Sequence, residues 1–270
     1  MKLAISNIAW SPDEDEAISG LMREYGVTGV EIAPTKIWPH PLTTSSGELT
    51  AYTRFWHSRG IRLSSMQALL FGRPDLTIFE TAEKRQETLD YLKGITRIGG
   101  RLGAEVLVFG SPRNRSIGAL NKEIAEEIAI QFFRQVGQFA ESNGLIFCIE
   151  PNPEAYGCDF VTTSAEGRDL VAKVGHPGFG LHLDAAGMSL SHENIEVELE
   201  KSVSELCHFH ISEPDLRPIG SDGVDHQLFA STLSSLGYEG WLSVEMRAPG
   251  TTGTVGGIAE ALGVVRQYYC

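Results

Sequence analysis

Eight short apolar runs recur along the whole chain at intervals of about 34 residues, and stretches with helical spacing separate them. The runs lie at residues 2–6, 28–32, 61–66, 105–109, 145–150, 179–184, 206–211 and 240–245. Their apolar side chains and their glycine and proline boundaries are typical of strands. Strands that alternate with helices form parallel sheets, and eight such units predict an α/β fold of the (β/α)8 TIM-barrel type.

The stretches between the runs carry signals for the start and the end of helices. The first, residues 13–25, opens after Ser11 and Pro12, a capping residue followed by a proline that suits a first helical turn. Residues 82–102 place leucines and isoleucines on one face, and residues 123–142 behave likewise. Several helices are expected to end in a left-handed glycine that leads straight into a strand, at Gly26, Gly60, Gly103, Gly144 and Gly237.

No low-complexity tract or linker rich in proline, glycine or serine divides the chain, so we expect one TIM-barrel domain over residues 1–270. An open, doubly wound sheet is the alternative fold. It would need a glycine-rich phosphate-binding turn after an early strand, and residues 5–10 do not supply one. The barrel is therefore the preferred prediction.

The composition argues against several classes of partner. The formal net charge is -13, whereas a protein that binds nucleic-acid phosphates needs basic patches. The four cysteines show no C-x-x-C spacing, which favours reduced thiols in a cytoplasmic protein. The first residues do not have the pattern of a signal peptide, and no apolar run approaches the roughly 18 residues that span a membrane. We therefore expect a cytoplasmic protein without nucleic-acid or membrane partners.

Three acidic residues and one histidine stand at the ends of the last four predicted strands. Glu150 ends the fifth strand, Asp184 the sixth and Glu245 the eighth, while the seventh delivers His210. The separations along the chain are 34, 26 and 35 residues, each about one strand–helix unit. Active sites of such barrels form where the strands end, so the four side chains should share one mouth of the barrel. Three converging carboxylates would repel one another, and some of their pKa values would rise, unless a cation is present.

A divalent cation would remove this repulsion. An oxygen-rich set with one imidazole suits Mn²⁺, Mg²⁺ or Co²⁺ better than structural Zn²⁺, which favours cysteine and histidine. We therefore expect one divalent metal ion, with Mn²⁺ as the first choice and Mg²⁺, Co²⁺ or Zn²⁺ as alternatives. The alternation of side chains along strands puts a further polar set on the same inward face, one layer deeper: Cys148, His182, His208 and Ser243.

Five other residues near the predicted mouth have a functional and a structural interpretation. Trp10 and Trp38 follow the first two strands and could stack on the apolar face of a substrate, or pack in an oligomer interface or a lid. Gln67 ends the third strand and could bind a substrate hydroxyl or cap a loop. Arg113 and Arg115 follow the fourth strand and could bind a phosphate or carboxylate of the substrate, although solvated loop charge is the simpler interpretation.

In these features the chain resembles the xylose-isomerase-like TIM-barrel superfamily and, within it, the sugar isomerase/epimerase group. The likeness is greatest to ketose 3-epimerases of the tagatose/psicose type and to hydroxypyruvate isomerase. It covers the chain in length and strand order. Its specific part is Glu150-Pro151, Leu183-Asp184, His208-x-His210-x-x-Glu213 with Arg217 and Gly220, and Val244-Glu245.

The resemblance implies roles for individual residues. The metal ligands would be Glu150, Asp184, His210 and Glu245, and the two glutamates would double as the acid/base pair. Arg217 would contact the substrate near the metal. Glu31 ends the second strand at a position where the group often carries glutamate, and we count it among the substrate-binding candidates.

The implied activity is isomerisation or epimerisation of a sugar or keto-sugar. A carboxylate removes the proton next to a carbonyl that the metal polarises, and a metal-stabilised enediolate follows. Return of the proton from the opposite face inverts the carbon, whereas return to the neighbouring carbon moves the carbonyl. Two carboxylates on opposite sides, Glu150 and Glu245, suit inversion.

The same residues are compatible with other functions. Dehydration of an inosose-type cyclic ketone starts with the same proton, and a metal- or sugar-binding module without catalysis is a further alternative. A nuclease acting at abasic sites is disfavoured, because it needs more histidine ligands than this chain offers. The chain also departs from the epimerases at Gly187, where they carry a histidine that helps to hold the substrate. The expected partner is a small carbohydrate, and a homo-oligomer such as a dimer is compatible with the sequence.

Overall fold

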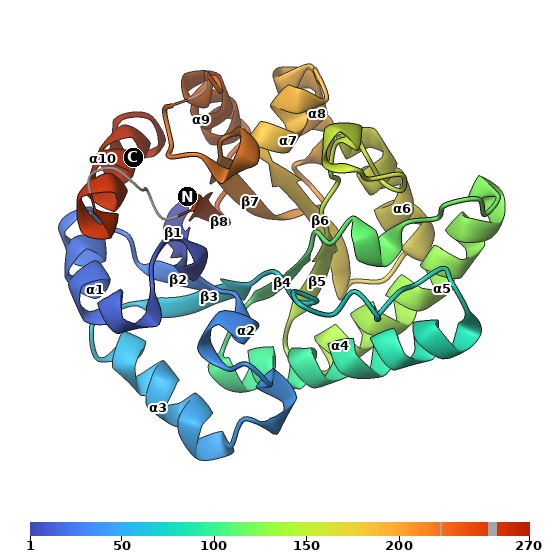
Figure 1. The fold of residues 1–270 in the computed structure, drawn as a ribbon. Coiled ribbons are helices and arrows are strands. Elements are labelled where there is room, and N and C mark those ends of the chain that lie inside the picture. The colour runs from blue at the N-terminus through green and yellow to red at the C-terminus, as the bar shows by residue number, and fades with distance from the viewer. Residues whose placement is uncertain (222, 248–252) are drawn as a thin grey trace.

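Eight parallel strands form a closed barrel in the computed structural model, which describes residues 1–221, 223–247 and 253–270. The strands pair in chain order, and β8 pairs with β1 to close the barrel (Figure 1). The predicted TIM barrel is thus confirmed. The strands are β1 (Lys2–Ser6), β2 (Gly29–Ile32), β3 (Arg62–Met66), β4 (Val106–Phe109), β5 (Ile146–Ile149), β6 (Phe179–Asp184), β7 (Leu206–Ser212) and β8 (Trp241–Glu245).

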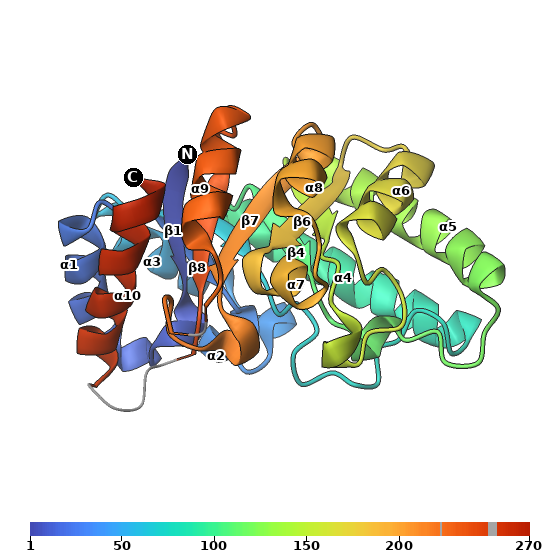
Figure 2. The same cartoon turned by 90° about the horizontal axis from the view of Figure 1, so that it is seen from above.

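Longer helices surround the barrel, and each connects one strand to the next or follows the last strand. In the described part of the chain they are α1 (Asp15–Glu24), α3 (Ser46–His57), α4 (Ala82–Leu102), α5 (Lys122–Glu141), α6 (Ser164–Val174), α8 (Ile195–Ser202), α9 (His226–Ser235) and α10 (Thr254–Tyr269). Two short helices, α2 (Pro34–Ile37) and α7 (Ala185–Leu190), directly follow β2 and β6. Both lie on the side where the strands end, away from the N-terminus (Figure 2). Within the described residues, none of the helices has the length and apolar character needed to cross a membrane.

The helix boundaries follow from local capping chemistry. The predicted helix over residues 82–102 matches α4, whose first turn is capped by the Thr81 side chain accepting from the Lys84 amide. After Ser11, a short 3₁₀ turn (Pro12–Glu14) precedes α1, so this helix begins two residues later than residue 13. The five glycines predicted to end helices all have positive φ angles between 69° and 78°. This conformation is costly for other residues and turns the chain towards the next strand.

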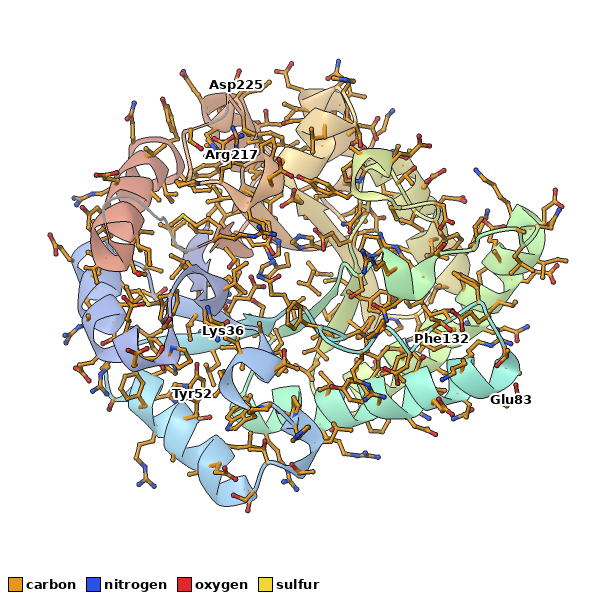
Figure 3. All side chains as sticks on the ribbon, viewed as in Figure 1. Lys36, Tyr52, Glu83, Phe132, Arg217 and Asp225 are labelled. Carbon is orange, nitrogen blue, oxygen red and sulfur yellow. The ribbon has the colours of Figure 1, made fainter. Side chains whose placement is uncertain are left out.

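The main apolar core lies between the barrel and the helix ring. Phe133 of α5 stacks on Phe179 of β6 with 4.9 Å between ring centroids, and it also meets the edge of Phe109 in β4. Phe132 beside it is also buried (Figure 3). Each such side chain contributes about 1.5–3 kcal/mol by leaving water. This packing fixes the outer helices against the strands whose ends carry the polar residues.

The inside of the barrel is unusually polar near the strand ends. Ser64, Ser65, Glu31, His182, His208, His210 and Ser243 are all fully buried. Below them, β6 and β7 have an irregular register between Leu181 and His182, and Gly180 leaves room for the Cys207 thiol, whose sulfur would lie 2.2 Å from a β-carbon at that glycine. Buried polar groups must find partners, so this layer is a hydrogen-bond network that can orient the side chains above it.

Candidate metal and active site

The structure brings together the four side chains that the sequence placed at the strand ends. Asp184 and Glu245 are the last residues of β6 and β8, His210 lies in β7, and Glu150 directly follows β5. One donor atom each from Glu150, Asp184 and His210 lies within 4.8 Å of the others. The Nδ1 atom of His210 is 3.3 Å from Glu245 Oε2 and 3.9 Å from Asp184 Oδ2. Three carboxylates therefore converge on one imidazole ring.

Crowding of the carboxylates changes their acidity. Burial raises the pKa of Glu150 to about 8, and the neighbouring Glu245 and Asp184 add to the rise while His210 opposes it. Part of the Glu150 surface stays accessible, but its carboxyl group is surrounded by protein. Burial followed by the charge of Glu245 likewise raises the pKa of Asp184 to about 6. Without a cation, the site holds protons that ordinary carboxyl groups would release at neutral pH.

The hydrogen bonding of the His210 imidazole indicates whether these residues fit a metal. Its Nδ1 atom is buried and makes no hydrogen bond, although it faces the carboxylates of Asp184 and Glu245. An unpaired buried nitrogen is costly in a folded protein, and a metal ligand bond would satisfy it. Three carboxylates and one imidazole form a donor set that suits Mn²⁺, Mg²⁺ or a similar divalent ion. The residues present therefore fit the expected cation.

A layer of hydrogen bonds lies directly under the imidazole. Glu31 of β2 is fully buried, and its Oε2 accepts from His210 Nε2 (3.0 Å) and Ser243 Oγ (3.0 Å). Its Oε1 accepts from Ser65 Oγ at 2.8 Å. Burial alone would raise the pKa of Glu31, but the facing His210 and His208 rings and these hydrogen bonds lower it to about 2. The structure thus makes Glu31 a partner of His210 below the mouth, in place of the substrate contact suggested by the sequence.

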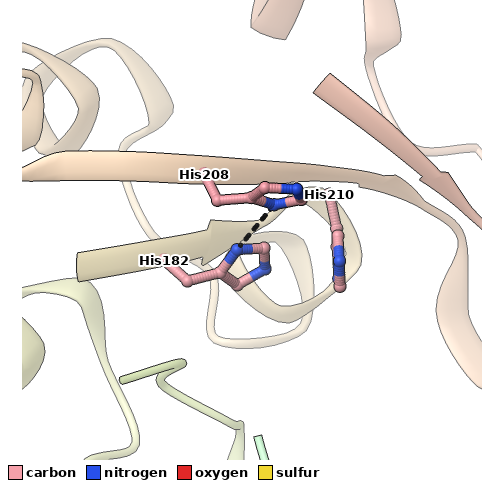
Figure 4. Close-up of side chains that lie close together, drawn as sticks. All are labelled: His182, His208 and His210. Carbon is pink, nitrogen blue, oxygen red and sulfur yellow. Dashed lines mark hydrogen bonds between the residues drawn. The ribbon is translucent and has the colours of Figure 1, made fainter. Parts of the chain in front are cut away.

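Gln67 and two more histidines complete this layer. Gln67 Nε2 donates to Ser6 Oγ (2.7 Å) and, more weakly, to Glu31 Oε2 (3.3 Å). The rings of His182 and His208 lie side by side with 3.3 Å between their Nδ1 atoms, and His210 stands next to them (Figure 4). Burial lowers the pKa of both, that of His208 to about 4, so they are neutral. Nitrogens of the three rings come within 4.8 Å of one another. His208 and His210 contact Ser65 and Glu31, whereas Nε2 of His182 is buried and has no hydrogen-bond partner.

Arg115 has a structural role. Its side chain is fully buried, and the guanidinium donates to the carbonyl oxygens of Phe109 (3.2 Å), Glu150 (2.7 Å) and Phe160 (3.0 Å). It holds the backbone at Glu150 in place, a role different from the anion binding suggested by the sequence. Arg113 is exposed on the same turn, so only this arginine keeps the predicted role as a candidate.

The tryptophans also differ in their surroundings. Trp10 is buried, donates from Nε1 to Asp15 Oδ1 at 2.7 Å and packs edge-on against Trp56. Trp10 therefore belongs to the main apolar core. Trp38 is partly buried and lies edge-on against Tyr52, 5.3 Å between centroids. Its neighbour Lys36 sits on α2, at the strand-end side of the barrel (Figure 3).

Arg217 lies on the segment that follows β7, and buried side chains fix this segment. Glu213 accepts from the Gly220 amide (2.9 Å), from the Val224 amide and from His226 Nε2 (3.1 Å). His226 is held in turn by Tyr269 at 3.0 Å. Arg217 itself is exposed, between β7 and α9 (Figure 3). Glu213, whose part in the sequence motif was unresolved, is thus the anchor of the segment that carries Arg217.

Gly110 is a site residue that the sequence reasoning missed. It directly follows β4, and a β-carbon at this position would lie 1.8 Å from Oε2 of Glu150. No real β-carbon can lie so close, so Glu150 can occupy its position only because residue 110 has no side chain. A glycine at a strand end beside the expected mouth was the signal in the sequence.

We expect Gly110→Ala to displace the Glu150 carboxylate and to weaken divalent-metal binding by about 10- to 100-fold, as for other residues that orient ligands. Titration of the metal-free protein with Mn²⁺ measures this. Gly20→Ala in α1 is the matched control, because nothing lies within 4 Å of its added β-carbon. The control should bind Mn²⁺ normally and gain up to about 1 kcal/mol in stability. Equal metal affinities in the two folded variants would contradict the steric role of Gly110.

This chain is similar to known proteins over most of its length. The family model described as "Xylose isomerase-like TIM barrel" matches residues 20–268. A probable ketose 3-epimerase of Synechocystis is 22% identical over 254 residues, which cover 91% of this chain and 84% of that protein. D-psicose 3-epimerase of Ruminiclostridium cellulolyticum is 28% identical over 132 residues, but this match covers only 47% of this chain and 44% of that protein.

Solved structures show the same fold over the full length. A D-psicose 3-epimerase from Clostridium cellulolyticum, crystallised with D-tagatose, has a TM-score of 0.81 at 18% identity and covers 100% of this chain and 99% of its own. A 3-keto-D-glucoside 4-epimerase from E. coli has a TM-score of 0.82 at 17% identity and covers 99% of both chains. The resemblance found in the sequence is confirmed: this chain belongs to the family of xylose isomerase-like TIM barrels.

Proposed function

We propose that this protein is a divalent-metal-dependent isomerase or epimerase that moves a proton next to the carbonyl of a sugar or keto-sugar. The observation that carries the proposal is the convergence of three carboxylates on the His210 imidazole at the mouth of the barrel, two of them facing its unpaired Nδ1 atom. A protein that only binds sugar has no need for this set. Family membership supports the proposal, since the relatives named above are sugar epimerases.

The assigned roles follow from the positions of the side chains. Glu150, Asp184, His210 and Glu245 would hold the cation, with Mn²⁺ as the expected ion. When bound, the cation would act as a Lewis acid and make the proton next to the substrate carbonyl more acidic. Glu150 and Glu245 come from β5 and β8, on either side of His210, and one would remove the proton while the other returns it. Transfer between opposite faces inverts the carbon and gives an epimer.

The substrate class is inferred from the relatives and from the mouth of the barrel. Solved relatives were crystallised with D-tagatose and D-fructose, which are ketoses. In this chain Gly187 is buried against Asp184, and a β-carbon there would lie 3.3 Å from Oδ1 of Asp184 and 3.6 Å from Cδ of Pro153. Arg217 stays our candidate for substrate contact, on the segment that Glu213 anchors. We therefore propose a ketose or a keto-glycoside as the substrate.

Product analysis tests the proposal. The protein is incubated with Mn²⁺ and a panel of ketohexoses, 3-keto-glycosides, hydroxypyruvate and inososes, and the products are identified by NMR. We expect a new epimer or a shifted carbonyl from at least one member, and no product when a chelator is present. Loss of water from an inosose alone would point instead to a dehydratase. No conversion of any member, with the metal bound, would favour a binding module and contradict the proposal.

A further inference from the structure

The polarity of the hydrogen bonds beneath the site can be derived from one group, Glu31. Its buried carboxylate can only accept hydrogen bonds, and Ser65 Oγ lies 2.8 Å from Oε1. The single proton of the Ser65 hydroxyl is used in this bond. Ser65 Oγ must therefore accept from His208 Nε2, at 2.9 Å. The proton of neutral His208 then sits on Nε2, and its bare Nδ1 accepts from His182 Nδ1.

The other oxygen of Glu31 can also only accept a hydrogen bond, so His210 must donate to it. Oε2 lies 3.0 Å from His210 Nε2, so this nitrogen must carry a proton. An imidazole that binds a cation through one nitrogen keeps only this proton, so Nδ1 is the atom left for the cation. That atom faces Asp184 and Glu245 and has no hydrogen-bond partner. The opposite tautomer would bring the bare lone pair of Nε2 against a buried carboxylate, where the two would repel.

We propose that Glu31 is a positioning residue, which holds His210 in the orientation and tautomer that present the Nδ1 lone pair to the cation. This inference rests on the proposed function, because it assumes a metal among the strand-end carboxylates. Glu31 contacts neither metal nor substrate in this account. Its negative charge also makes the imidazole a stronger ligand, as carboxylates behind metal-binding histidines do. Its neighbours Ser65, Ser243 and Gln67 hold the carboxylate itself in place.

The variant Glu31→Gln tests this role, because it keeps the size of the side chain and removes the charge. We expect its affinity for Mn²⁺, measured by competition with a chelating dye, to fall by about 10- to 100-fold. The matched control is Glu105→Gln, the same substitution at the opposite end of the barrel, where Glu105 pairs with Arg62 and Lys2. The control should keep the metal affinity. A purely structural role of Glu31 would lower the stability of Glu31→Gln and leave its metal affinity unchanged.

A second measurement needs no variant. With Zn²⁺ bound as a diamagnetic probe, ¹⁵N NMR of histidine-labelled protein should show His210 protonated at Nε2 and metal-bound at Nδ1. Metal bound at Nε2, or unchanged Mn²⁺ affinity in Glu31→Gln, would overturn the inference. Neither measurement uses a sugar, so an inactive protein that shows both expected results would contradict the proposed function alone. A wild-type protein that binds no metal would overturn both.

Discussion

Replacement of Glu150 or Glu245 by glutamine is expected to lower kcat by about 100- to 10,000-fold, the usual contribution of a general acid or base. Glutamine keeps an oxygen that can bind a cation but can neither accept nor return the proton. The loss should therefore persist at saturating Mn²⁺, which separates it from a loss of metal. Both carboxylates lie close to His210, so either variant should interrupt proton transfer.

Glu105→Gln is the matched control for this prediction. Glu105 precedes β4 at the opposite end of the barrel, where it pairs with Arg62 and Lys2. This variant should keep wild-type kcat, and all three proteins should show similar unfolding in urea. Substantial turnover in both Glu150→Gln and Glu245→Gln would contradict the acid/base assignment, whatever the metal content.

The second large effect concerns the stability of the metal-free protein. The folded chain keeps protons on Glu150 up to about pH 8 and on Asp184 up to about pH 6, whereas the unfolded chain releases them near pH 4. His182 and His208 oppose this effect below about pH 6.5, because they take up protons there only in the unfolded chain. Above that pH the unfolded state binds fewer protons, so the free energy of unfolding should fall as the pH rises to about 8. The lowered pKa of Glu31 acts only below about pH 4.5, outside this window.

Mn²⁺ should reverse this loss. At a concentration 100 times its Kd, the ion should raise the free energy of unfolding by about 2.7 kcal/mol. At a fixed concentration the gain should be larger at pH 8 than at pH 6, because protons then compete less for the carboxylates. Urea unfolding at pH 6, 7 and 8, with Mn²⁺ or with a chelator, measures both effects. Glu150→Gln should flatten the slope with pH, while a flat slope in the wild-type protein would contradict the electrostatic account.

The sequence predicts the fold and the strand-end residues because both depend on local information. Strand and helix periods and glycine caps can be read within one strand–helix unit, and α4 matches its predicted range. Closure of a parallel barrel then brings equivalent strand ends to one mouth. Glu150 shows how small the remaining error is, since it lies one residue beyond β5 and still faces His210.

The roles that the sequence assigned differently depend on contacts between distant strands. Glu31 and His210 are 179 positions apart, and they meet because the barrel closes and because β2 shifts its register against β3 beside Glu31. Arg115 lies in a polar turn, where the sequence suggests a solvent-exposed charge. Its guanidinium instead donates hydrogen bonds to several backbone carbonyl oxygens. Gly110 matters only through the position of a side chain on the next strand. Spacing along the chain contains none of this information.

Solvent deuterium incorporation tests the central claim most directly. The protein with Mn²⁺ is placed in D₂O with a ketose that it converts or binds, and deuterium at the carbon next to the carbonyl is followed by NMR. The account predicts exchange that requires the metal and disappears in Glu150→Gln and Glu245→Gln. Absence of deuterium at that carbon in every sugar tested, while one ion per chain is bound, would contradict proton transfer at this site.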